Sequence, residues 1–334
     1  MRLLTLACAA MLLLNPARSL AQGVSADKYF PEGTDTVIQL NLNQLMGSKL
    51  LAKGIPLVVK KYGENVMSMM ANFVPDDNVK KMMQDMAPEL KNHVTEEAVS
   101  RAMEAGKEAV RDFTVAINSK EEVNGIPQLT ICMGIPAVNA AMVEQFVPMM
   151  QGSGQIEVKS EEIGGVTVFE MKPNTAPMAF YMAVPEDGMM VMSISKDTLT
   201  KTIKNKGKNN VNPEFKALLA QRKNSYTLFA AGLAPKNRPG EKHFVATLTV
   251  DKDINGNVNV ECEDADKAKE KAKEANEGFE GAVSTIMGFA DDHPELKPLS
   301  ESLKKVKAEV TGSNVKMNLS VNGDDLIKAM KDAK

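Results

Sequence analysis

The chain has 334 residues, a formal net charge of −3 at pH 7, 43% hydrophobic residues, no Trp and four Tyr. A surface that binds nucleic acid needs a basic patch and usually aromatic side chains on which bases stack, so this composition argues against a nucleic-acid partner. The length is typical of two core-forming units, and the hydrophobic content is enough to supply a core for both.

The N-terminal residues predict a secretory signal peptide. Arg2 is followed by an apolar run from Leu3 to Leu14 and then by small residues at Ser19 and Ala21, which is the order of charged, apolar and small residues in such a signal. The run is shorter than the roughly 18 to 20 apolar residues of a membrane-spanning helix, and no later segment approaches that length. We therefore expect a signal peptide at residues 1–21, a periplasmic or extracellular mature protein, and no transmembrane segment.

The first part of the mature chain predicts a strand, several helices and a hairpin. A short apolar run from Thr36 is typical of a mostly buried strand, and prolines divide the stretch at about residues 48–110 into several helices. The segment from Phe113 then alternates apolar and polar residues on both sides of Asn124-Gly125. Because Asn and Gly both tolerate the positive φ angles of a tight turn, this pattern predicts a β-hairpin.

A helix, two more hairpins and two short helices are expected next. The helix begins near Pro136, and the hairpins turn at Gly164-Gly165 and at residues 186–188. The short helices lie near residues 198–205 and 213–222, on either side of a flexible basic run that we take as a domain boundary near residue 207.

The second part of the chain repeats the order of the first. A strand from Ser225 precedes a predicted hairpin from Phe244, and a shift of 131 residues places Asn124-Gly125 on Asn255-Gly256 without a gap. A longer helix follows with alanines at steps of three and four, which would let it lie close to a sheet, and Pro294 and Pro298 mark an additional helix. A final hairpin turns near Ser313.

These patterns predict an α+β fold of two repeated β-β-α-β-β units, with antiparallel sheets covered by helices on one face. The first unit takes residues 22–206 and includes a helical insertion at about 48–110. The second unit takes residues 207–334. Whether the two sheets merge into one is left open.

Several segments together resemble a family of exported bacterial proteins that is frequent in planctomycetes. They are "YFPEGTDTVIQLNLNQLMGSKLL", "GGVTVFEMK", "SISKDTLTKTI" and "VKMNLSVNGDDLIKAM". The similarity is a diffuse pattern over most of the mature chain and includes no invariant chemical motif. It implies an uncharacterised extracytoplasmic protein with no assigned activity, and it transfers no site residues.

A calcium site is one alternative that the sequence raises. Asp251, Asp253 and Asn255 match the first ligand positions of an EF-hand loop, and Gly256 follows them. The position that should supply a bidentate Glu is Cys262, and strand patterns lie where the flanking helices belong. A polar hairpin turn accounts for the same residues, so we assign no metal ligand here.

The methionine content raises a second metal alternative. The chain has 23 Met, and closely spaced thioethers can bind copper(I). Met67, Met70, Met82, Met83 and Met86 fall at helical core spacing, which favours packing or a Met-lined groove for an apolar ligand or a partner helix.

The two cysteines of the mature chain are Cys132 and Cys262, and export would permit a disulfide between them. Strand alternation places Cys132 opposite the apolar face of its strand and Cys262 on the apolar face of its own, which argues against pairing. The pairing is left open.

Enzymatic motifs are sparse. His93, His243 and His293 belong to no metal-binding or hydrolase motif, and no nucleophile elbow or phosphate-binding loop is present. Asp291, Asp292 and His293 could form a metal site or an acid–base pair, but a helix that ends before a proline needs only solvated polar residues there, so we favour a structural turn. The adjacent pairs Glu121-Glu122 and Glu161-Glu162 point to opposite faces of extended segments.

The sequence therefore favours an exported, non-enzymatic binding or envelope-associated protein whose partner is an unknown protein or an apolar ligand. A calcium or copper carrier and a hydrolase without a local motif are the alternatives. We assign no catalytic, cofactor-binding or metal-ligating residues.

Overall fold

The computed structural model describes residues 25–71, 81, 94–152, 156–174, 178–205, 211–234 and 239–333. The predicted signal peptide, His93 and Met82, Met83 and Met86 lie outside the described residues, as do the side chains of Met67 and Met70. Within the described residues the protein is mixed α+β, which confirms the predicted class. Its twelve strands form one open sheet in the order β11-β12-β10-β9-β8-β1-β2-β3-β7-β6-β5-β4.

Contacts divide the chain into two compact units. Unit 1 combines the residues up to Asn43 with Glu108–Thr247, and unit 2 combines Gln44–Lys107 with Leu248–Lys334. This grouping differs from the two predicted domains, because the helices after Gln44 pack with the C-terminal part of the chain. The boundary near residue 207 rests on the predicted repeat and stays a prediction.

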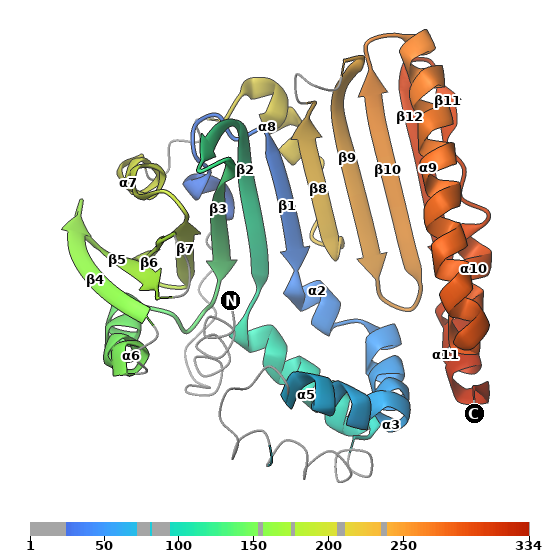
Figure 1. Ribbon diagram of the computed structural model, residues 1–334, viewed down its shortest axis with the longest axis horizontal. Coiled ribbons are helices and arrows are strands. Elements are labelled where there is room, and N and C mark those ends of the chain that lie inside the picture. Colours follow the sequence, from blue (N-terminus) through green and yellow to red (C-terminus); the bar gives the residue numbers. More distant parts are fainter. Residues whose placement is uncertain are drawn as a thin grey trace. The chain divides into compact units, whose positions relative to one another are not determined.

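Unit 1 contains most of the sheet (Figure 1). Its strands are β1 (Thr36–Asn41), β2 (Asp112–Val123), β3 (Ile126–Gly134), β4 (Ile156–Ile163), β5 (Val166–Pro173), β6 (Phe180–Glu186), β7 (Met189–Ser193) and β8 (Leu228–Leu233). Its helices are η1 (Ala26–Tyr29), α6 (Ala140–Gly152), α7 (Lys196–Lys204) and α8 (Pro213–Leu219).

Helices cover both faces of the strands β5, β6 and β7 in unit 1, whereas the sequence predicted cover on one face. Neighbouring residues of β5 show this, because Val168 belongs to the buried cluster that contains Leu199 of α7, while Phe169 belongs to the cluster that contains Val143 of α6. All five residues of β7 are buried. A strand without an exposed residue needs cover on both sides, and the continuous apolar run in this part of the sequence was the signal for it.

Unit 2 is built around the C-terminal hairpins (Figure 1). It contains α3 (Lys49–Ala71), β10 (Ile254–Cys262), α9 (Ala265–Asp292), η2 (Pro294–Leu296), α10 (Lys297–Leu303), β11 (Glu309–Thr311), β12 (Asn314–Val321) and α11 (Gly323–Asp332). The elements β9 (Glu241–Val250), α2 (Leu42–Met46) and α5 (Glu96–Ala109) contain the divisions between the units.

The alanine stripe of α9 packs on one face of the unit 2 strands, as predicted. Ala268 and Ala272 are buried against Val315 of β12 and Cys262 of β10. The opposite face of the same strands carries polar side chains, and Asn257 Nδ2 donates a hydrogen bond to Asn318 Oδ1 at 2.7 Å. One apolar face and one polar face are typical of an antiparallel sheet that is covered on one side.

The two predicted Asn-Gly turns have different outcomes. Asn124 and Gly125 form the turn between β2 and β3 with φ angles of 53° and 76°, which is the conformation of a tight hairpin. Asn255 and Gly256 instead lie inside β10, paired with Ser320 and Leu319 of β12, so the prediction of a turn there was wrong. β9 and β10 are joined by residues 251–253, where the Asp251 amide donates to the Asp253 carbonyl.

The cysteines and the described methionines of β5–β7 belong to the cores. Cys132 and Cys262 are both buried, lie in different hydrophobic clusters and are free thiols. The buried methionines of β5, β6 and β7 are Met171, Met182, Met189, Met190 and Met192. Packing therefore accounts for the methionines of this segment.

Candidate functional site

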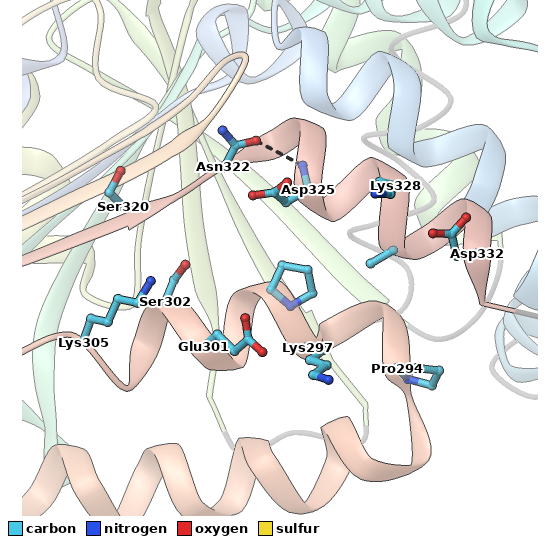
Figure 2. A pocket seen from close by; sticks show the side chains of 12 residues that line it. Pro294, Lys297, Glu301, Ser302, Lys305, Ser320, Asn322, Asp325, Lys328 and Asp332 are labelled. Carbon is cyan, nitrogen blue, oxygen red and sulfur yellow. Dashed lines mark hydrogen bonds between the residues drawn. The ribbon is translucent and has the colours of Figure 1, made fainter.

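A groove in unit 2 separates α10 from α11, and Figure 2 shows it from close by. Its volume is about 540 Å³. One wall consists of Pro294, Lys297, Pro298, Glu301, Ser302 and Lys305, the end of β12 contributes Ser320 and Asn322, and the other wall consists of Asp325, Lys328, Ala329 and Asp332.

Local sequence signals position both walls. Asn322 caps α11 by accepting a hydrogen bond from the Asp325 amide at 3.0 Å, and Asp324 and Asp325 in the first turn complement the helix dipole. Pro294 and Pro298 stand at the first turns of η2 and α10, where proline is compatible with a helix. The groove is therefore held between two helices whose starts are fixed by their own residues.

Six charged side chains line the groove with both signs in equal number. Lys297, Glu301 and Lys305 follow one another at steps of four on one wall. Lys328 lies between Asp325 and Asp332 on the other wall. Within the part of the chain that the structure describes, none of the six forms an ion pair.

A cluster of polar side chains joins α3 to η2 in unit 2. The Tyr62 hydroxyl donates to Glu295 Oε1, and Lys61 Nζ lies 3.1 Å from Glu295 Oε2. His293 Nδ1 lies 3.2 Å from the Tyr62 hydroxyl and 3.5 Å from Glu295 Oε1. The Glu295 side chain is only 8% exposed.

The charge of Glu295 is stabilised by its partners. Burial alone would raise the pKa of this carboxyl group, but hydrogen bonds from Tyr62, from its own backbone amide and from Lys61 outweigh burial and lower the pKa to about 2. The hydrogen bond to Glu295, followed by burial, raises the pKa of the Tyr62 phenol. Both oxygens of the carboxylate are engaged, and none of the four residues lines the groove. The cluster thus holds η2 against α3.

Of the predicted acid–base candidates whose side chains the structure describes, His293 lies in this cluster. His293 directly follows the end of α9 at Asp292, as the sequence predicted. The side chains of Asp291 and Asp292 lie outside the described residues. The partners of His293 are Tyr62 and Glu295. The sequence did not indicate this cluster, because Tyr62 and Glu295 are 233 positions apart.

Asp253 and Asn255, two of the residues that matched a calcium loop, each bond to a different part of the fold. Asp253 Oδ1 accepts a hydrogen bond from the Gly323 amide at 2.9 Å, which ties the β9–β10 turn to the start of α11. Asn255 Oδ1 accepts from the Ser320 hydroxyl at 3.0 Å, across the strand pair. Among the described residues, no three His, Cys, Asp or Glu side chains are grouped so that they could hold a metal ion.

The remaining candidates do not line the groove. His243 lies in β9 and Glu161 in β4, where it forms an ion pair of 2.8 Å with Lys196. Glu121 lies near the end of β2.

No family model matches the sequence, and no curated protein or solved structure was found to be similar to it. None of the described helices combines the length and the apolar character that crossing a membrane requires.

Proposed function

We propose that this is an exported, non-enzymatic binding or envelope-associated protein, and that the groove between α10 and α11 holds a partner segment carrying charges of both signs. One observation carries the proposal. The groove presents three lysines and three carboxylates, none of them neutralised by an ion pair among the described residues. Charged groups at a recognition surface give specificity when the partner supplies charges of the opposite sign.

The shape and the lining of the groove favour a polypeptide segment over a small molecule. Small-molecule sites are mostly apolar and enclose the ligand. In this groove the apolar residues are Pro294, Pro298 and Ala329, and charged side chains line both walls. An extended segment could lie between the helices and place its side chains alternately toward each wall.

The edges of the sheet are less suitable for a partner. β4 is an edge strand whose Glu157, Lys159, Glu161 and Glu162 are exposed, and β11 at the other edge has only three residues. Charged and very short edge strands protect a sheet from pairing with another chain. This leaves the helical groove as the better place for a partner.

Synthetic peptides of equal length test the proposal by fluorescence anisotropy. One peptide contains both Lys and Glu, one only Lys and one only Glu. We expect the mixed peptide to bind most tightly and its affinity to fall with added salt, because salt screens exposed charges.

Adjacent lysines provide a matched control. Lys305 lines the groove and Lys304 does not, although both are exposed. Lys305→Glu should weaken binding of the mixed peptide several-fold, and Lys304→Glu should leave it unchanged. Equal binding of the three peptides, or equal effects of the two variants, would overturn the proposal.

We also propose that the fold arose by duplication of one β-β-α-β-β unit. The strand order supports this, because β8-β9-β10 and β1-β2-β3 extend in opposite directions from the antiparallel pair of β1 and β8. β12 then follows β10 directly, whereas β7 and β6 separate β5 from β3. Inserting two antiparallel strands preserves the direction of the next strand, so β5 and β12 run antiparallel to β3 and β10 respectively.

An experimental structure tests the duplication. We expect β1, β2 and β3 to superimpose on β8, β9 and β10, and β5 to have the same chain direction relative to β3 as β12 has relative to β10. A different direction for either member of the pair β5 and β12 would refute it.

A further inference from the structure

A second groove of unit 2 also borders α11. Its volume is about 520 Å³. We call it the α3 groove, because α3 forms one of its walls and α11 forms the other. The α3 wall includes Lys53, Pro56 and Leu57, and the α11 wall includes Asp324, Ile327 and Lys331.

The helix α11 separates the α3 groove from the groove between α10 and α11. Side chains three or four positions apart share one face of a helix. Asp325 and Ala329 line the groove between α10 and α11, and Ile327 lines the α3 groove. Lys328 and Asp332, which Figure 2 labels, line both grooves. A segment that contacts Lys328 and Asp332 in one groove therefore already borders the other.

The α3 groove reaches the hydrophobic core of unit 2. Ile327 is 7% exposed and belongs to a buried cluster, and Leu57 is a partly buried side chain that packs against this cluster. Pro56 is also partly exposed. Within the described part of the chain, no leucine, isoleucine or valine lines the groove between α10 and α11. The α3 groove thus offers an apolar contact that its neighbour lacks.

Charged side chains surround this apolar floor. Lys53, Glu96 and Lys331 line the α3 groove and are exposed. An apolar centre with a charged rim is the usual anatomy of a protein interface, and a side chain buried at such a centre contributes most of the binding energy. An aliphatic side chain of a polypeptide partner suits this lining.

We propose that the partner segment crosses α11 and places an aliphatic side chain in the α3 groove, against Pro56, Leu57 and Ile327. The inference rests on the proposed function of the groove between α10 and α11, and it adds a second contact at a defined spacing. A helix with its side chains is about 10–12 Å across, and an extended segment rises about 3.3 Å per residue. The aliphatic residue should therefore lie about four residues from the charged stretch.

Extended peptides test the crossing by fluorescence anisotropy on the mature chain. The mixed Lys/Glu peptide is extended at either end by Gly-Ser-Gly and then Leu, and a matched pair carries Ser in place of Leu. At one of the two ends we expect Leu to raise the affinity about tenfold over Ser, because most of its surface is buried. Added salt should lower both affinities and leave their ratio unchanged, since salt screens charges and not apolar burial.

A change in the order of the added residues tests the spacing. With Leu directly next to the charged stretch and Gly-Ser-Gly after it, the peptide keeps its composition but its Leu cannot reach across α11. We expect this peptide to bind like the one with Ser.

Adjacent residues of α3 provide matched variants. Leu57→Gln should remove most of the gain from Leu. Val58→Gln should leave that gain unchanged, because Val58 is 40% exposed on the same helix and lines neither groove. If Leu57→Gln does not fold, as judged by its thermal melt, Pro56→Gln must reduce the gain instead. Pro56→Gln should fold, because proline is unfavourable inside a helix.

The outcomes separate this inference from the proposed function. If the mixed peptide does not bind, or if Lys305→Glu leaves its binding unchanged, the proposed function is wrong and the crossing is wrong with it. If the mixed peptide binds and Lys305→Glu weakens it, but Leu gives no gain at either end, the crossing alone is wrong. The crossing is also wrong if both positions of Leu give equal gains, or if the α3 variants reduce the gain no more than Val58→Gln does.

Discussion

The Arg222 guanidinium donates two hydrogen bonds to the Asp27 carboxylate, at 2.9 and 2.7 Å. The pair fastens η1 to the segment that follows α8 in unit 1, and both side chains are largely buried, with exposures of 24% and 22%. The Tyr29 hydroxyl donates to Glu186 Oε1 at 2.6 Å and fastens η1 a second time. These contacts hold η1 against the segment after α8 and against β6.

Arg222→Lys should lower the free energy of unfolding. Lysine cannot reproduce the two parallel hydrogen bonds of a guanidinium group, and we expect a loss of about 1–2 kcal/mol. Urea unfolding measures it. Arg101→Lys is the control, because the Arg101–Glu97 pair is exposed at 80% and 75% and should contribute within about 0.5 kcal/mol. Equal losses in the two variants would contradict a specific role for the pair.

The two Asn-Gly pairs should respond differently to substitution. Gly125 has a φ of 76°, where an L side chain costs about 1 kcal/mol, so Gly125→Ala should destabilise the protein. Gly256 lies inside β10, paired with Leu319, where Ala should be neutral or slightly stabilising. Thermal melts of the two variants measure the contrast. A larger loss for Gly256→Ala would mean that β10 is not formed as described.

These pairs also show what the sequence could and could not predict. Turns, caps and the alanine stripe of α9 depend on neighbouring residues, and most were predicted from local pattern. Asn255-Gly256 was misassigned because a turn at residues 251–253 and the pairing of β10 with β12 outweighed the local preference for a turn. Local propensity is a weak prior when strand pairing offers more hydrogen bonds.

The features that the sequence did not predict are contacts between residues far apart in the chain. The insertion of β6 and β7 between β3 and β5 sets the strand order, and no local pattern encodes it. The hydrogen bond from Gln128 of β3 to Thr198 of α7 spans 70 positions. Gln128 was part of a predicted hairpin and Thr198 part of a predicted helix, but nothing in either segment indicated that their side chains meet.

The cluster of Glu295 with Tyr62 and Lys61 makes the stability of unit 2 depend on pH. The pKa of Glu295 is about 2 in the folded protein, below its usual 4.5. A lowered pKa stabilises the fold above about pH 4.5, and this contribution is lost as the pH falls toward 2. Glu295→Gln should therefore lower the free energy of unfolding by about 2–3 kcal/mol at neutral pH, and the difference from the wild type should shrink between pH 4.5 and 2.

Denaturant unfolding at several pH values measures the effect of Glu295→Gln. Glu277→Gln is the control, because Glu277 is 67% exposed in a weak pair with Lys273 at 3.8 Å. A constant difference between Glu295→Gln and the wild type across this pH range would exclude the charge of Glu295 as the cause.

The β9–β10 turn is fixed against α11 by Asp253 and Gly323. A Cβ atom added to Gly323 would lie 1.9 Å from the Lys252 carbonyl oxygen, too close for any side chain without movement of the backbone. Gly323→Ala should therefore destabilise unit 2 by about 1–3 kcal/mol. A thermal melt measures the loss, and Gly278→Ala is the control, because nothing lies within 4 Å of the Cβ position at Gly278.

Asp253 distinguishes a structural turn from a calcium loop. Its Oδ1 accepts from the Gly323 amide at 2.9 Å, and the side-chain oxygen of Asn can do the same. If the hydrogen bond is the role of Asp253, Asp253→Ala should cost about 1 kcal/mol, Asp253→Asn should cost less, and calcium should leave all the melting temperatures unchanged. If the turn binds calcium, the ion should raise the wild-type melting temperature by mass action, and Asp253→Asn should abolish that rise. We expect the first result for two reasons. Asn255 accepts a hydrogen bond from Ser320 across the strands, so it is not arranged as a calcium ligand. Position 12 of the motif is the buried Cys262, so the carboxylate that closes a calcium loop is absent there.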